Sequence, residues 1–530
     1  MERAVQALPW HPRHNPWAIA LTVTLATFME VLDTSIANVA LPHIAGGLSA
    51  GQDESTWVLT SYLVSNAVIL PISAWLATRM GRKRFYMMCV ALFTASSFLC
   101  GLAPSLGMLI LFRILQGAGG GGLAPSEQAI LADTFPPSRR GIAFAVYGMA
   151  VVVAPAIGPT LGGWITDNYS WRWIFYINIP VGLLSLFLTY RMVEDPPYLA
   201  IERARSRGVK VDYVGLGLVA LGVGCLQVVL DKGQEADWLS SPWIAAFLTV
   251  AVTTLLVWIF WEWFHPNPIV DLRLFQSRNF AVAMTITFVL GTVLFGTTVL
   301  IPQFLQTLLG YSAVQAGEAL AGGGFAMLLM MPMAGMLVSR VDPRAMMAAG
   351  FASTALALVY MSRHLTLGID FPTAALLRTL QTLGLAFIFI PSNTLAYVGV
   401  PQEKNNQVSA MNAFVRNVGG SIGIAIIITF VVRQSQKHQN FLVQHASAGS
   451  SQFHSAIEGM SRVLTSHGID AVQSTQKAYA IMYQAIRAQA TTLGYVDVIS
   501  VLALIVACLT PLSYLMKRGL PGTGREPGMH

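Results

Sequence analysis

Fourteen long apolar runs, separated by polar segments, constrain this chain more than any other feature. They lie at residues 17–41, 55–79, 84–103, 107–133, 139–166, 172–193, 212–231, 241–264, 279–309, 312–340, 345–362, 371–398, 405–432 and 493–516. A membrane-spanning helix needs roughly 20 mostly apolar residues. Only helices and closed barrels can satisfy their backbone polar groups in a bilayer, and these runs lack the alternation of barrel strands. The sequence therefore predicts an all-α polytopic membrane protein with 14 transmembrane helices.

The charge content excludes a water-soluble protein. Asp, Glu, Lys and Arg make up 11% of the 530 residues, whereas a soluble domain carries about 25%. Hydrophobic residues make up 54%, which excludes a disordered chain. Four cysteines in a chain of this length exclude a disulfide scaffold.

The positions of the basic residues predict the orientation. Of the 32 Lys and Arg, 21 lie at the termini or in loops after even-numbered runs, eight lie in loops after odd-numbered runs, and three lie inside runs. Basic loops tend to stay in the cytoplasm, so we expect both termini there. The net charge of +7 reflects this asymmetry and is therefore no evidence for a nucleic-acid partner.

Charge and loop length divide the chain into two blocks of six helices. Such a plan suggests two bundles with a substrate cavity between them. The expected segments are a cytoplasmic tail (1–16), an N-terminal six-helix bundle (17–193), a cytoplasmic linker (194–211), two additional helices (212–264), a cytoplasmic connector (265–278), a C-terminal six-helix bundle (279–516) that includes a periplasmic loop (433–492), and a cytoplasmic tail (517–530).

The segment after the second run contains a basic motif. Residues 74–83 resemble the loop motif G-x-L-A-D-R-x-G-R-K of the major facilitator superfamily, with Thr78 in place of the Asp. Arg79, Gly81, Arg82 and Lys83 match the motif, and the resemblance implies a cytoplasmic gating role for them. Ordinary cytoplasmic positive charge is the alternative interpretation.

The fourth and fifth runs contain two further motifs of that superfamily. Arg113 and Gln116 begin a match to R-x-x-Q-G-x-G, and the resemblance gives this Arg a role in proton coupling. The fifth run resembles the antiporter motif G-x-x-x-G-P-x-x-G-G, which implies a kinked helix that seals the cavity during exchange. The alternative is ordinary tight helix packing. The residues of this motif are Ala154, Pro155, Gly158, Pro159, Gly162 and Gly163.

Further matches resemble one family within the superfamily. They cover residues 32–42, 170–180, 267–275 and 416–423, and together they resemble the EmrB/QacA family of fourteen-span drug:proton antiporters, EmrB type. The resemblance implies the major facilitator fold and export of lipophilic drugs across a bacterial inner membrane. It also implies a periplasmic adaptor and an outer-membrane channel as partners, with loop 433–492 as a docking surface.

Four acids, among them Glu318, lie inside the predicted helices. Glu30 and Asp33 are three residues apart and share a helix face. Ionisable groups inside a membrane are expensive to bury and are functional by default. We therefore expect Asp33, with Glu30, to carry the coupling proton beside Arg113 and Glu127. Alternatively, Asp33 is a structural carboxylate that caps a backbone or pairs with Arg113.

Polar, aromatic and methionine side chains in the central runs suit an adaptable substrate pocket. Most of them are equally compatible with simple packing. The candidates are Asn38, Gln116, Gln303, Gln306, Glu318, Met411, Asn412, Phe414 and Arg416.

No motif points to a cofactor or an enzyme. Residues 117–122 match G-x-G-x-x-G, but a dinucleotide site needs a preceding strand, and here the run lies in an apolar helix. The sequence contains no Walker A lysine motif. We therefore expect a transporter driven by the proton gradient. The alternatives are a proton-coupled uptake symporter, which the fifth-run motif disfavours, and a membrane-bound enzyme or sensor.

Overall fold

The computed structural model describes residue 10 and residues 12–206, 211–446 and 450–516. These ranges contain 14 helices long and apolar enough to cross a membrane, and no strand. The predicted all-α fold with 14 spans is confirmed. The spanning helices are α2 (Pro16–Gly47), α4 (Trp57–Met80), α5 (Arg82–Leu102), α6 (Leu106–Gly120) with α7 (Leu123–Thr134), α8 (Arg140–Asn168), α10 (Asn178–Met192), α12 (Tyr213–Lys232), α13 (Pro242–Phe264), α14 (Arg278–Leu309), α15 (Ala313–Leu337), α16 (Pro343–His364), α17 (Phe371–Ala396), α18 (Asn405–His445) and α20 (Ala471–Leu509).

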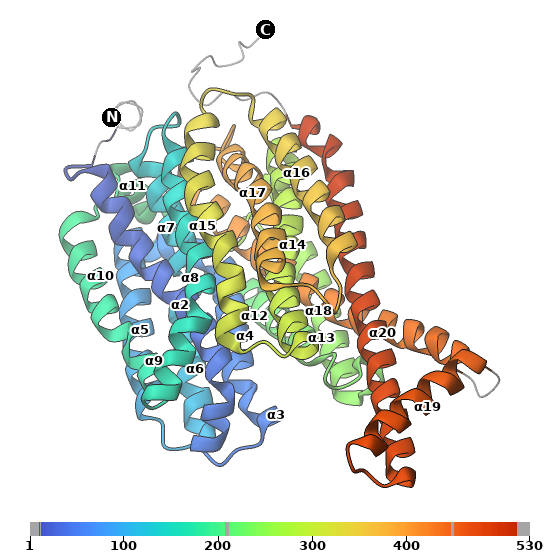
Figure 1. Cartoon of the computed structure of the whole chain (residues 1–530). Coiled ribbons are helices and arrows are strands. Elements are labelled where there is room, and N and C mark those ends of the chain that lie inside the picture. The colour runs from blue at the N-terminus through green and yellow to red at the C-terminus, as the bar shows by residue number, and fades with distance from the viewer. Residues whose placement is uncertain (1–9, 11, 207–210, 447–449, 517–530) are drawn as a thin grey trace.

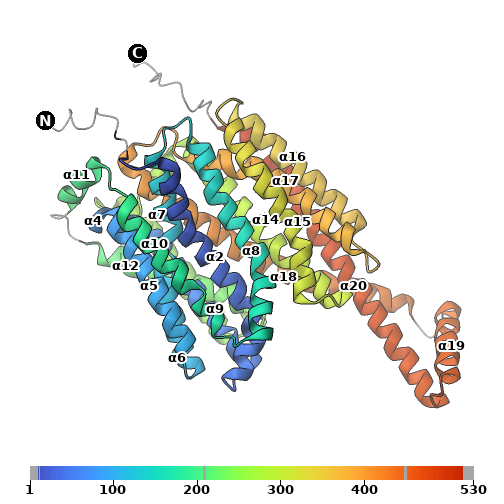
Figure 2. The same cartoon turned by 60° about the vertical axis from the view of Figure 1, so that its left-hand side comes forward.

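The helices form two bundles that lie side by side (Figure 1 and Figure 2). In the N bundle (α2 to α10), α2 packs against α8 and α10, and α6 packs against α4 and α5. In the C bundle (α14 to α20), α14 packs against α18, and α17 packs against α15 and α16. The bundles meet along two seams, α8 with α15 and α17, and α4 and α7 with α18.

The two additional helices lie on one flank of this pair. Helix α12 packs against α4 of the N bundle and α18 of the C bundle. Helix α13 packs mainly against α12 and leaves Leu256, Phe260 and Phe264 exposed. Large exposed apolar side chains on a helix of this length fit contact with lipid.

The two ends of the molecule differ in shape. Helix α2 begins and α20 ends at one end, called here the terminus side, whereas α19 (Ser451–Ser466) lies at the other, called here the α19 side (Figure 1). The sequence predicts a polar loop at residues 433–492, with an amphipathic helix as one interpretation of 471–490. In the structure, α20 covers 471–490, α18 also continues into this segment, and both form a helical projection with α19 (Figure 2).

The fourth span is broken rather than continuous. Helix α6 ends at Gly120, and a turn at Gly121 and Gly122 leads into α7. Before the break, a Cβ on Gly117 would clash with the backbone oxygen of Tyr62, which shows how closely α6 approaches α4. The glycine run therefore provides close packing and also interrupts the helix.

Helices α14 and α18 pack backbone to backbone. A Cβ on Gly419 of α18 would clash with the backbone oxygen of Phe288, and one on Gly291 of α14 would clash with that of Arg416. Backbone atoms cannot rotate away as a flexible side chain can. The contact between α14 and α18 therefore tolerates no side chain at either glycine.

We expect Gly419→Val to lower the thermal unfolding midpoint of the purified protein, because the added side chain forces α14 and α18 apart at a cost of about 1–3 kcal/mol. The matched control is Gly217→Val on α12, where no atom lies within 4 Å of the added Cβ. Tryptophan fluorescence during heating measures both. Equal midpoints for the two variants would contradict this view of the contact between α14 and α18.

Candidate functional site

A buried ion pair lies inside the N bundle. Arg113 Nη1 of α6 donates to Asp33 Oδ2 of α2 at 2.5 Å, and the two side chains are 0% and 1% exposed. The second carboxylate oxygen accepts from Gln116 Nε2 at 3.0 Å and from Asn178 Nδ2 of α10 at 2.7 Å. Both oxygens of Asp33 are thus bonded, and three helices meet at one carboxylate.

The guanidinium of Arg113 is fixed on several sides. It donates to Gln116 Oε1 at 2.8 Å and to the backbone oxygen of Val58 at 3.1 Å. It also lies 4.3 Å from the ring centroid of Tyr62, within cation–π range. The pairing of Asp33 with Arg113 that the structural alternative required is therefore present.

Two further acids of the N bundle lie within electrostatic range of the C bundle. Glu30 accepts from Asn66 Nδ2 at 2.9 Å and from the Tyr62 hydroxyl at 3.2 Å. Glu127 of α7 accepts from the Thr24 hydroxyl at 2.6 Å, while its other oxygen is buried with no hydrogen-bond partner in the described chain. Arg416 of the C bundle acts electrostatically on both acids.

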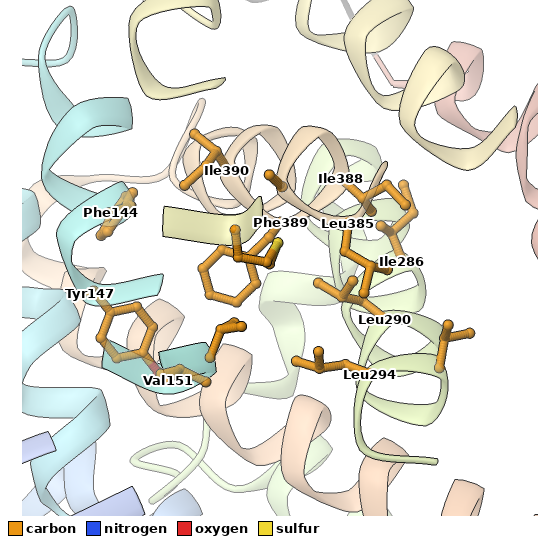
Figure 3. Close-up of a cluster of buried hydrophobic side chains, with 14 of the residues drawn as sticks. Phe144, Tyr147, Val151, Ile286, Leu290, Leu294, Leu385, Ile388, Phe389 and Ile390 are labelled. Atoms are coloured by element: carbon orange, nitrogen blue, oxygen red, sulfur yellow. The ribbon is translucent and has the colours of Figure 1, made fainter. Parts of the chain in front are cut away.

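Arg416 lies at the interface of the bundles, among aromatic rings. It donates to the Tyr147 hydroxyl of α8 and lies 5.8 Å from the ring centroid of Phe389 of α17. Figure 3 shows Phe389 in one apolar cluster with side chains of α8, Tyr147 among them. One turn away on α18, Asn412 Nδ2 donates to Gln128 Oε1 at 2.9 Å. This interface combines apolar surface with a few polar groups, as ligand sites do.

The loop motif forms a second cluster at the terminus side. Arg82 is buried, pairs with Asp133 at the end of α7, and donates from Nε to Asn406 Oδ1 of α18 at 2.7 Å. Asn405 Nδ2 donates to Asp133 Oδ1 at 2.7 Å. The motif lacks an acid at Thr78, and Asp133 provides the carboxylate for Arg82 instead. Two asparagines of the C bundle bind this pair.

The other motif residues surround the turn between α4 and α5. Gly81 has φ +95°, a conformation that L side chains rarely adopt, so this position requires glycine. Arg79 lies 5.5 Å from the ring centroid of Trp75, and Lys83 Nζ donates to the backbone oxygen of Tyr190 at 2.7 Å.

Helix α11 (Pro197–Ser206) adds to this cluster from the linker after the N bundle. The Tyr198 hydroxyl donates to Asp133 Oδ2 at 2.6 Å. Burial raises the pKa of the Glu202 carboxyl to about 7, against the opposing effect of Arg82 and with a further rise from Glu403. Because Glu403 precedes α18, α11 places an acid of the linker near an acid of the C bundle.

The antiporter motif brings α8 against α2 beside Asp33. A Cβ on Gly158 would clash with Ser35 Oγ, and one on Gly162 would lie 3.2 Å from the Cα of Ile36. Pro159 has no N–H for the backbone oxygen of Pro155, and Ser35 Oγ donates to that oxygen at 3.3 Å. The motif therefore fixes the α2 segment that carries the paired carboxylate. Its remaining residues, Ala154 and Gly163, are buried too.

The structure separates the remaining predicted residues into two groups. Glu318 lies inside α15, as predicted, but in the second turn of that helix, where the residue is exposed rather than buried. Gln116 joins the Asp33 network. The buried candidates at the bundle interface are Met411, Asn412 and Arg416, with Phe414 half-buried. The other exposed candidates are Asn38, Gln303 and Gln306.

The sequence reasoning missed several partners of the charged groups. Asn178 bonds Asp33, Tyr62 and Asn66 bond Glu30, and Asp133 bonds Arg82. The absence of an acid at position 78 was a usable signal, since a buried Arg in the loop motif then needs a carboxylate from elsewhere.

Two six-helix bundles with buried charges beside their interface form a polytopic membrane protein, and its family match makes it a transporter, not an enzyme. Residues 23–424 match the profile of the Major Facilitator Superfamily. The chain belongs to this superfamily, and within it to the EmrB type, as its resemblance predicted.

The chain is similar to curated relatives over most of its length. It is 37% identical over 445 residues to the Multidrug export protein EmrB of Escherichia coli (strain K12), covering 83% of this chain and 86% of that protein. It is 36% identical over 502 residues to the Fatty acid resistance protein FarB of Neisseria gonorrhoeae, covering 94% and 96%. It is 30% identical to the Colistin resistance protein EmrB of Acinetobacter baumannii (strain ATCC 17978), covering 98% and 100%.

Solved structures share the fold at low sequence identity. The proton:xylose symporter XylE superposes with a TM-score of 0.59 at 14% identity, covering 95% of this chain and 99% of that one. The human organic anion transporter MFSD10 gives a TM-score of 0.57 at 12% identity, covering 93% and 100%. These likenesses show the major facilitator fold.

We expect Arg113→Gln to lower the thermal midpoint strongly, because it leaves the Asp33 carboxylate buried without its cation, and breaking a buried pair costs about 3–5 kcal/mol. The double variant D33N/R113Q removes both charges and keeps amide groups at both positions, so it regains most of the stability. Thermal unfolding of the purified variants measures this. A double variant as unstable as R113Q would show that the charges themselves do not matter.

Proposed function

We propose that the protein exports lipophilic drugs and other toxic compounds in exchange for protons across a bacterial inner membrane. The proton gradient drives the exchange without a cofactor, and both termini lie in the cytoplasm. The names of the relatives, which include two EmrB proteins, support a drug exporter. The asymmetry of Lys and Arg along the sequence supports the orientation.

The observation that carries the proposal is the Asp33–Arg113 pair, completed by Gln116 and Asn178. The Asp33 carboxylate accepts from one cation and two amides, so a proton bound to it would remove the charge with which Arg113 pairs. Proton uptake at Asp33 breaks the pair and frees Arg113. The N bundle then has two electrostatic states, and the presence of one proton selects between them.

Glu30 and Glu127 provide intermediate positions for that proton. Glu30 lies one turn from Asp33 on α2 and shares Tyr62 with Arg113. Glu127 has one unbonded oxygen within the described residues, so it can gain a proton without losing a hydrogen bond. Acids on α2 and α7 thus extend the Asp33 network toward the bundle interface.

Hydrogen bonds between the bundles support alternating access. They involve the terminus-side segments of α4, α5, α7, α8 and α18, so in the proposed orientation the cytoplasmic side is closed. Transport requires these bonds to break and the bundles to rock. Among the described residues, the bonds join Arg82 and Thr78 to Asn406, Asp133 to Asn405, Gln128 to Asn412, and Tyr147 to Arg416.

The interface around Arg416 is the proposed substrate region. It has the aromatic rings of Tyr147 and Phe389 and the amides of Asn412 and Gln128. A buried methionine, residue 411, adjoins Asn412 on α18. Aromatic and thioether groups contact varied apolar ligands with little geometric demand.

We expect Asp33→Asn to abolish coupled exchange, because an amide cannot take up the proton and cannot bind Arg113 as an ion pair. Glu30→Gln and Glu127→Gln should each slow exchange without abolishing it. In everted membrane vesicles energised by respiration, adding a lipophilic dye such as ethidium should collapse part of the proton gradient, as read by acridine fluorescence.

The matched control is Asp53→Asn, which removes an exposed acid of α3 (Gln52–Ser55) on the α19 side. It should behave as the wild type. An Asp33→Asn protein that exchanges dye for protons at the wild-type rate would refute proton coupling through this pair.

We also propose that the projection of α18, α19 and α20 binds a periplasmic adaptor that leads to an outer-membrane channel. The projection extends beyond the rest of the bundle on the side opposite the termini (Figure 2). It carries exposed apolar side chains outside the expected spans, including Val443, Val463, Val472 and Tyr479. Such exposed groups favour contact with a protein partner.

Replacing residues 451–466 by a Gly-Ser segment of equal length should abolish drug resistance of a double-membraned host while dye–proton exchange in everted vesicles persists. Exchange needs only the bundles, whereas export past the outer membrane needs the partner. Minimum inhibitory concentrations and the vesicle assay separate these effects. Full resistance with the replaced segment would remove α19 from the docking surface.

A further inference from the structure

The two bundles contain the same short motif on equivalent helices. Arg113-Ile-Leu-Gln116 lies on the fourth span of the N bundle, and Arg378-Thr-Leu-Gln381 lies on α17, the fourth helix of the C bundle. A Pro-Ser pair follows each motif, at 125–126 and at 391–392. The two arginines therefore hold corresponding places in the two halves of the fold.

The hydrogen bonds of the two motifs also correspond. Arg378 Nη1 donates to Gln381 Oε1 at 2.6 Å and to Thr297 Oγ1 at 2.8 Å, and Gln381 Nε2 donates to Thr297 Oγ1 at 3.1 Å. In the N bundle, Asp33 receives the corresponding bonds from Arg113 and Gln116. Thr297, on the first helix of the C bundle, thus stands where the first helix of the N bundle has its carboxylate.

Because Thr297 occupies the place of a carboxylate, the charge of Arg378 is uncompensated. The guanidinium remains protonated at any relevant pH, and a threonine hydroxyl is neutral. Arg378 is 5% exposed, and no ion pair of the described residues includes it. A cation buried at this depth needs a compensating anion or a water-lined cavity.

One edge of the guanidinium has a donor to spare for such an anion. Nε is buried without a hydrogen-bond partner among the described residues, and Nη2 donates to Thr298 Oγ1 at 2.8 Å. Thr298 is half-buried, unlike the fully buried Thr297. The Nε and Nη2 hydrogens point in parallel, as bidentate binding of a carboxylate requires.

We propose that Arg378 binds the anionic group of a transported amphiphile, a carboxylate or a comparable acid, with Thr298 beside it. The inference rests on the proposed export function and assigns a residue that binds the acidic group of one class of its substrates. The N bundle holds its own carboxylate for the proton, whereas the C bundle leaves the corresponding cation for the substrate.

The test measures ligand binding to the purified full chain in lipid nanodiscs without added chloride. The ligands are laurate and dodecyltrimethylammonium, which have similar chains and opposite charge, and intrinsic tryptophan fluorescence reports their Kd. We expect Arg378→Gln to raise the Kd of laurate at least about tenfold, since a charge-assisted hydrogen bond contributes about 1.5–3 kcal/mol. The Kd of dodecyltrimethylammonium should stay within about twofold.

A second variant keeps the test informative even if Arg378→Gln fails to fold. Thr297→Asp supplies the carboxylate that the N bundle already has, so it should pair with Arg378, keep or raise the thermal midpoint, and still weaken laurate binding by a similar factor. Arg378→Lys retains the charge and should keep most of the affinity. Laurate binding that is unchanged in both R378Q and T297D would overturn the proposal.

Further measurements distinguish an amphiphile from other anions that could occupy the site. If chloride, or phosphatidylglycerol in the nanodisc, raises the midpoint of the wild type but not of T297D, while laurate binds all variants equally, the site holds an inorganic or lipid anion and the proposal fails. The export function is tested separately by dye–proton exchange in vesicles. Wild-type exchange with an unaltered laurate Kd in R378Q would therefore refute this inference alone.

Discussion

A charge inside a bilayer must be compensated, and the N bundle depends on how Asp33 and Arg113 compensate each other. The carboxylate receives donors from α6 and α10, and the guanidinium reaches back to α4. Each bond removes a polar group from hydrocarbon, so separating these helices would expose charges at a cost of several kcal/mol. These bonds therefore hold α2, α4, α6 and α10 together as one unit.

The contacts between the bundles are of a different kind. Asn412 and Gln128 are neutral amides that bond to each other, and Arg416 donates to the Tyr147 hydroxyl. Phe144 stacks on Tyr397 with 5.5 Å between the ring centroids. The ion pair of the loop motif lies within the N bundle, and Asn405 and Asn406 bond to it from the start of α18. Hydrogen bonds with at most one charged partner contribute about 1–3 kcal/mol each. Opening this interface therefore costs less than separating the helices inside the N bundle.

The sequence predicts the parts of the fold that local composition determines. An apolar run of membrane length has one stable outcome, so all 14 spans could be found. The polar extension of α18 carries no such signal, and the turn at Gly121 and Gly122 depends on packing against α4 and α5. Asp133 and Asn178 lie 51 and 145 residues from their partners, beyond the reach of any local pattern.

The repeated Arg-x-Leu-Gln motif shows how one constraint can have two outcomes in one chain. Beside Arg113 the first helix offers a carboxylate, which closes the charge balance within the protein. Beside Arg378 the first helix of the C bundle offers two neutral hydroxyls, which leave the positive charge uncompensated. In the proposed mechanism, the closed pair changes its state when a proton arrives, whereas the open cation changes its state when an anion arrives. On this proposal, the difference between Asp33 and Thr297 gives the two bundles separate electrostatic inputs, and both inputs act on the interface that the bundles share.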